Sequence, residues 1–148
     1  MKWLLDTNVV SETIRRRPSV RVINWLSERS QDDAAISIVA MAELSEGISL
    51  VTDASHRDAL KLWMDTTIIP WLGELILPLT EEILVDWLKL SRQLAAKRKA
   101  CKAPDTLIAA TARVRDLIVV SRNIRDFADT GIVVYDPWND HTHRMDPP

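Results

Sequence analysis

The stretch KWLLDTNVVSE, residues 2–12, decides how the chain begins to fold, because a run of apolar residues stops at an acid. Trp3, Leu4 and Leu5 are consecutive apolar residues, which predicts a short strand buried on both faces of a sheet. Asp6 follows at the carboxyl end of this strand, the edge where open α/β sheets usually bind ligands. Two interpretations of Asp6 are open at this point: it caps a helix, or it holds a ligand.

Short apolar runs of the same kind recur along the chain and predict four further strands, at residues 34–37, 75–77, 117–120 and 132–134. Helical patterns of apolar residues lie between them, and Pro104 suits the first turn of another helix. This alternation predicts an α/β fold: a short-stranded parallel sheet of about five strands, with helices on both faces. The chain has 148 residues, which is the size of one domain.

Composition indicates an ordinary globular protein, with 47% hydrophobic and 27% charged residues. The apolar runs are too short to cross a bilayer, and Asp6 interrupts the first one before a signal-peptide core forms. Cys101 has no second cysteine with which to form a disulfide, which agrees with a reducing compartment. We therefore expect a cytoplasmic protein without a membrane segment.

Charge is balanced overall but clustered locally. The formal net charge of −2 argues against a chain coated in basic residues for non-specific nucleic-acid binding. Two basic clusters nevertheless occur, at Arg15–Arg17 and at Lys97, Arg98, Lys99 and Lys102. Solvated helix faces and phosphate-binding surfaces both explain such runs.

Four acids stand near the end of a predicted strand or near the start of a predicted helix: Asp6, Glu43, Asp105 and Asp126. Helix capping explains any one of them taken alone. In a parallel sheet, however, strand ends and helix starts meet at one edge, so the four carboxylates are expected to converge in one crevice.

Converging carboxylates repel one another, and a hard divalent cation removes this repulsion. Mg²⁺ or Mn²⁺ prefers oxygen ligands and typically uses one or two carboxylates, several waters and a substrate phosphate. Phosphodiester hydrolysis is the reaction that such a site favours. The three histidines do not form a comparable set; a zinc site built from His141 and His143 is the weaker alternative.

Five short motifs resemble, in order and spacing, those of the PIN-domain ribonucleases, and in particular the VapC-type toxins of type II toxin–antitoxin pairs. The motifs are LLDTNVVSE, AELSEG, APDTLIAATA, VSRNIRDF and YDPW. The resemblance covers residues 2–138, so we expect a PIN domain over residues 1–138 and a flexible C-terminal tail over residues 139–148. It implies a three-layer α/β/α sandwich.

The resemblance also implies a function and its partners: a Mg²⁺- or Mn²⁺-dependent endoribonuclease that acts on RNA as a toxin. A homodimer is implied, as is a cognate antitoxin that neutralises the toxin. Operator DNA is implied only as a partner of that antitoxin.

The motifs assign residues to roles. Asp6 and Asp105 match the metal-holding acids, Glu43 and Asp126 complete the catalytic set, and Asn8, Ser121 and Asn123 match supporting polar positions. Ser121 departs from the threonine common in the family but keeps its hydroxyl. We expect the basic residues on the approach to the acids to contact RNA phosphates or an acidic antitoxin segment: Lys97, Arg98, Lys99, Lys102, Arg122 and Arg125.

Three alternatives compete with this reading. A phosphoacceptor signalling domain needs an acid after the third strand, where the chain has LPLT. A haloacid-dehalogenase-like phosphatase needs an aspartate at the position of Asn8. A catalytically silent PIN fold that only binds RNA or protein is the third, and the presence of all four acids argues against it.

Overall fold

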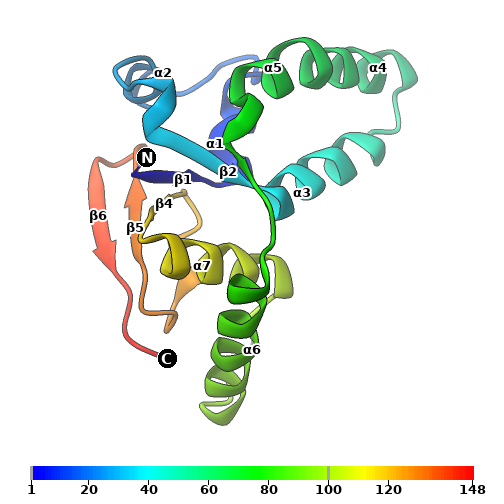
Figure 1. The fold of residues 1–148 in the computed structure, drawn as a ribbon. Coiled ribbons are helices and arrows are strands. Elements are labelled where there is room, and N and C mark those ends of the chain that lie inside the picture. The colour runs from blue at the N-terminus through cyan, green and yellow to red at the C-terminus, as the bar shows by residue number, and fades with distance from the viewer. Residues whose placement is uncertain (1, 100) are drawn as a thin grey trace.

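The computed structural model describes residues 2–99 and 101–148, which form a six-stranded sheet in the order β3-β2-β1-β4-β5-β6 (Figure 1). The strands are β1 (Trp3–Leu5), β2 (Ala34–Ser37), β3 (Ile76–Leu77), β4 (Ile118–Val120), β5 (Val133–Asp136) and β6 (His141–Arg144). The first five strands are parallel to one another, and β6 is antiparallel to β5. The predicted short-stranded parallel sheet is therefore confirmed.

Helices cover both faces of this sheet, as predicted. The helices are α1 (Thr7–Glu12), α2 (Val20–Ser27), α3 (Ile38–Ser49), α4 (Ala54–Trp63), α5 (Ile69–Leu72), α6 (Glu81–Ala96) and α7 (Ala103–Arg115). Short 3₁₀ turns occur at Gln31–Asp33, Gly73–Leu75 and Ile124–Phe127, and a π-helical turn at Met64–Ile68 joins α4 to α5. Figure 1 shows α6 and α7 on the side of the sheet opposite α1 and α2, which gives the three-layer α/β/α arrangement.

Burial explains why the central strands are consecutive apolar runs. Leu4 and Leu5 in β1 are fully buried, and all four residues of β2 are buried, because each face of these strands packs against helices. Ala109, Ala110 and Ala112 in α7 are also buried, and their small side chains allow the helix to pack closely in the core.

Helix caps position the elements that carry the acids. Ser37 ends β2 and its side chain accepts a hydrogen bond from the N–H of Val39, which fixes the start of α3. Pro104 lies in the first turn of α7, where a backbone N–H has no partner within the helix, so the N–H that proline lacks is not needed. α3 and α7 therefore both begin at the edge of the sheet where β1 ends and Asp6 lies.

The C-terminal segment corrects one expectation. Residues 139–148 were expected to form a flexible tail, but residues 141–144 form β6 and pair with the whole of β5. The backbone bonds continue beyond the strand, from the Gly131 N–H to the carbonyl of Asp146 and from the Met145 N–H to the carbonyl of Ile132.

In the part of the chain that is described, no helix is long and apolar enough to cross a membrane.

Candidate active site

The structure brings the four predicted acids to one edge of the sheet. Asp6 follows β1, Glu43 lies on α3, Asp105 lies in the first turn of α7, and Asp126 lies in the 3₁₀ turn after β4. The negative charge of Asp126 raises the pKa of both Asp6 and Asp105. The charges of Asp6 and Asp105 likewise raise the pKa of Glu43. The four carboxylates therefore form one electrostatic cluster.

Asp6 is the most buried of these acids, with 5% of its surface exposed, and hydrogen bonds fix its carboxylate. Oδ1 accepts from the backbone N–H of Thr7 at 2.8 Å and from its hydroxyl at 3.3 Å. Oδ2 accepts from the Ser121 hydroxyl at 2.6 Å and from the Asn8 amide at 2.9 Å. Asp6 thus caps α1 with one oxygen while two side chains hold the other.

Of the three expected supporting residues, Ser121 and Asn8 contact this acid through their side chains. The Asn8 amide also donates to the Ser121 hydroxyl at 3.0 Å, and its oxygen accepts from the backbone N–H of Arg122. The Asn123 backbone N–H donates to Ser121, whereas its exposed side chain forms no hydrogen bond to another described residue. Asn123 therefore acts through its backbone in this structure.

Burial and mutual repulsion raise the pKa of three of the acids. Burial raises the pKa of Asp105 to about 6, with further contributions from the charges of Asp126 and Asp6. Burial and the charges of Asp6 and Asp105 raise the pKa of Glu43. Burial also raises the pKa of Asp6, against the lowering effect of its bonds to Ser121 and Thr7. A positive ion placed among these carboxylates would offset that repulsion.

The donor set fits a hard cation with few protein ligands. The carboxylates of Glu43, Asp105 and Asp126 accept no hydrogen bond from any described residue, so their oxygens are available to a cation or to water. Within residues 2–99 and 101–148, no three His, Cys, Asp or Glu side chains form a group that could hold a metal ion together. A zinc cage is thus not present in the described part, whereas Mg²⁺ characteristically uses one or two carboxylates and keeps its waters.

The six expected RNA-contacting residues differ in their surroundings. Lys102 is exposed and its charge acts on both Asp105 and Glu43. By contrast, Lys99 pairs with Asp129 at 3.1 Å, and Lys97 donates to the carbonyl of Pro147.

The remaining three are exposed as well: Arg98, Arg122 and Arg125. Arg122 lies over the ring of Trp138, 5.2 Å from its centroid. Of the six, only Lys102 has a charge that acts on Asp105 and Glu43.

Glu12 closes the opening stretch of the sequence and was given no role in the prediction. Only 2% of its surface is exposed, and it accepts bonds from the Ser19 backbone N–H and from Arg15. Burial opposes its ionisation, but these bonds and the charges of Arg15 and Arg122 outweigh it and lower the pKa of Glu12. Glu12 therefore fastens the α1–α2 connection, which its position in the sequence did not reveal.

A cavity of about 440 Å³ opens beside the acids, between α1, α3 and α4. Thr7, Ser11 and Glu43 line its polar side, and its other walls are largely apolar, with Leu44 and Trp63 among them. Of the four acids, Glu43 thus faces this cavity.

The PIN domain family model matches residues 3–133. The chain belongs to the PIN-domain family. Among curated proteins, it is similar to the toxin FitB of Neisseria gonorrhoeae, with 32% identity over 93% of this chain and 99% of FitB. It is also similar to a VapC ribonuclease of Sinorhizobium fredii, with 26% identity over 91% of this chain and 96% of that protein.

Solved structures of PIN-domain complexes share this fold. The crystal structure of FitAcB from N. gonorrhoeae superposes with a TM-score of 0.85 at 32% identity, covering 92% of this chain and 98% of that one. The DNA-bound VapBC from Salmonella typhimurium superposes with a TM-score of 0.77 at 25% identity, covering 93% and 98%. The resemblance to the family that the motifs suggested is thus confirmed.

Proposed function

We propose that this PIN-domain protein is a Mg²⁺- or Mn²⁺-dependent endoribonuclease that acts as the toxin of a toxin–antitoxin pair. The observation that carries the proposal is the cluster of four carboxylates at one edge of the sheet. Burial and their mutual repulsion, which together raise the pKa of Asp105 to about 6, make the charged cluster unfavourable without a cation. The similarity to the toxin FitB and to a VapC ribonuclease supports the same function.

In this proposal Asp6 and Asp105 hold the metal ion. A bound Mg²⁺ or Mn²⁺ stabilises charge on a phosphoryl oxygen and lowers the pKa of a bound water. Ser121 and Asn8 keep the carboxylate of Asp6 in one orientation, which matters because misplaced ligands reduce reactivity steeply. Asp105 lies in the first turn of α7, where the partial positive charge of the helix N-terminus favours a negative charge.

Glu43 and Asp126 complete the proposed catalytic set. Glu43 is half-buried with a raised pKa, which suits it to accept a proton from the attacking water. Asp126 is exposed, and its carboxylate is free to orient water at the mouth of the site. Lys102, which lies close enough to influence Asp105 and Glu43, binds a substrate phosphate and thereby positions RNA without reading its sequence.

The proposed partners follow from the relatives. The neighbouring structures are those of FitAcB and VapBC, the second bound to DNA, so we expect a cognate antitoxin that contacts operator DNA on behalf of the complex. We also expect a homodimer that acts on RNA in the cytoplasm.

Cleavage of RNA by the purified, antitoxin-free protein tests this function. With Mg²⁺ or Mn²⁺, total cellular RNA should yield discrete fragments, and EDTA should abolish them. Asp105→Asn should lower the rate by at least about 100-fold, whereas Asp58→Asn, a control at an exposed acid on α4, should leave it unchanged.

Two results would contradict the proposal. The first is the absence of cleavage by folded protein with either metal ion, which favours a silent binding module. The second is cleavage that persists in EDTA and in Asp105→Asn, which indicates a contaminating nuclease or a different site.

A further inference from the structure

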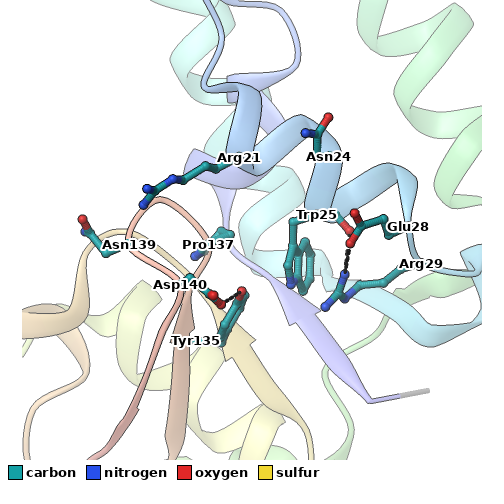
Figure 2. Close-up of a pocket in the computed structure, with 9 residues that line it drawn as sticks. All are labelled: Arg21, Asn24, Trp25, Glu28, Arg29, Tyr135, Pro137, Asn139 and Asp140. Atoms are coloured by element: carbon teal, nitrogen blue, oxygen red, sulfur yellow. Dashed lines mark hydrogen bonds and ion pairs between the residues drawn. The ribbon is translucent and has the colours of Figure 1, made fainter.

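A second cavity lies on the α2 side of the sheet, away from the four acids (Figure 2). Its volume is about 620 Å³, and its walls come from α2 and from the turn between β5 and β6. The side chains of Arg21, Asn24 and Asn139 border it, with the rings of Trp25 and Tyr135 at its base. Polar groups and aromatic rings therefore face the same space.

The aromatic part of this cavity is rigid. Trp25 and Tyr135 stack with their centroids 5.5 Å apart, and Trp3 packs edge-on against Trp25 at 5.2 Å. The Arg29 guanidinium lies 4.0 Å from the centroid of Trp25 and donates to the Trp25 carbonyl. The Tyr135 hydroxyl donates to Asp140 at 2.8 Å. These groups are held in place before any ligand binds.

The charge of Arg21 is not neutralised by an acid. Its guanidinium donates to the backbone carbonyl of Trp138, and it forms no ion pair within residues 2–99 and 101–148. Of the two acids at the cavity, Glu28 lies 3.9 Å from Arg29, whereas Asp140 accepts a hydrogen bond from Tyr135 and keeps its negative charge. Arg16 and Arg17, exposed in the segment that leads into α2, add positive charge on the approach. An anionic group is therefore the ligand that Arg21 favours.

Direct contacts connect this cavity to the acids. Asn8, which holds Asp6, accepts from the backbone of Arg122, and the Arg122 side chain lies over Trp138. The carbonyl of Trp138 in turn accepts from Arg21. The ends of β1 and β5 are two strand spacings apart, roughly 10 Å, with β4 between them. Two positive side chains, Arg122 and Arg21, thus lie along the path from the acids to the cavity.

We propose that this cavity is a nucleotide subsite that holds single-stranded RNA extending from the acids. The inference rests on the proposed ribonuclease function. Arg21 binds a backbone phosphate, and the aromatic floor excludes water beneath a base. The Asn24 amide faces the edge of that base, together with the amide oxygen of Asn139, whose amide N–H donates to Asp136. Single-stranded RNA is the ligand that combines a phosphate charge with splayed bases able to meet such groups.

RNA of two lengths tests the proposal. Binding of fluorescein-labelled oligouridylates of two and eight nucleotides is measured by anisotropy in the inactive Asp105→Asn protein, so that the RNA stays intact. Adding Arg21→Gln to this protein should weaken its binding of the eight-nucleotide RNA about three- to tenfold. It should also reduce the magnitude of the slope of log K for binding against log salt concentration by about 0.7. The dinucleotide, which is too short to reach from the acids to the cavity, should bind unchanged.

Further variants separate the subsite from general charge effects. Asn24→Asp adds a negative charge at the cavity without removing the bond of Arg21 and should weaken the longer RNA as well. The controls Arg92→Gln and Gln93→Glu make the same charge changes on the exposed surface of α6 and should have no effect. The indole N–H of Trp25, which has no hydrogen-bond partner among the described residues, should shift in NMR spectra only with the longer RNA.

The outcomes distinguish this inference from the function on which it rests. Metal-dependent cleavage with unchanged RNA affinity in Arg21→Gln would overturn the subsite and leave the ribonuclease standing. Loss of antitoxin binding alone in Arg21→Gln would also overturn it, because the surface would then belong to a protein partner. If wild-type protein does not cleave RNA and the Asp105→Asn protein does not bind it, both proposals fail.

Discussion

Asp6 fulfils one of the two roles that its position in the sequence left open, the helix cap, and we propose that it also holds a metal ion. It caps α1 through the N–H of Thr7, and its second oxygen is fixed by Ser121 and Asn8. The two oxygens of this carboxylate offer about four acceptor sites, and four donors from Thr7, Ser121 and Asn8 reach them. Helix geometry and site geometry are therefore set by the same side chain.

The first prediction concerns one residue, Asp105, and its effect on the free energy of unfolding. Asp105→Asn should stabilise the metal-free protein at pH 8, because the folded state raises the pKa of Asp105 to about 6 and so disfavours its charge. The gain should be on the order of 1 kcal/mol, since the half-buried group is partly screened by solvent. It should shrink as the pH falls through about 6, because wild-type Asp105 then becomes neutral.

Urea denaturation in EDTA at pH 8, 6 and 5 measures this difference. Asp58→Asn, at an exposed acid, serves as the control and should match wild type at each pH. A destabilised Asp105→Asn protein at pH 8 would show that the carboxylate supports the fold rather than a ligand.

The acids could be predicted from the sequence because each follows an apolar strand or stands in or near a helix start. The bond between Ser121 and Asp6 could not, because it joins residues 115 positions apart and depends on β4 lying next to β1. The second cavity was also not predicted, since it requires α2 to lie beside the β5–β6 turn.

At the scale of elements, the strands that carry a signal in the sequence are those buried in the sheet. All five apolar runs form strands, within two residues of the predicted ends. β6 has the sequence HTHR and is largely exposed, so only its backbone bonds to β5 define it, and these leave no hydrophobic pattern. α1 has only six residues, too few for a helical repeat to be visible.

Deletion of residues 139–148 tests the structural role of β6. Truncation removes the ladder to β5 and the bonds of Gly131 and Met145. The free energy of unfolding should fall by about 2–4 kcal/mol, given a net value near 1 kcal/mol for each lost bond.

Thermal denaturation should therefore show a clearly lower Tm for the truncated protein. Removal of Pro147 and Pro148 alone, which leaves β6 intact, should have little effect. A full truncation that unfolds at the same temperature as wild type would support the flexible tail expected from the sequence.

At the scale of the whole molecule, acids and basic residues are arranged around one edge of the sheet. The four carboxylates lie at the ends of β1 and β4 and at or near the starts of α3 and α7, while Lys102 and Arg122 flank them. In the function that we propose, the acids of this site attract a divalent cation and the basic residues around them attract RNA phosphates.

Calorimetric titration of the metal-free protein with Mn²⁺ tests the central claim most directly, because it asks whether the acid cluster binds a cation at all. Wild-type protein and Asp58→Asn should bind Mn²⁺ at pH 8, and Asp105→Asn should bind at least about tenfold more weakly. Affinity should also fall at pH 5, where Asp105, with its pKa raised to about 6, is largely protonated. Folded protein that binds no Mn²⁺, or that binds it equally well without Asp105, would contradict the account.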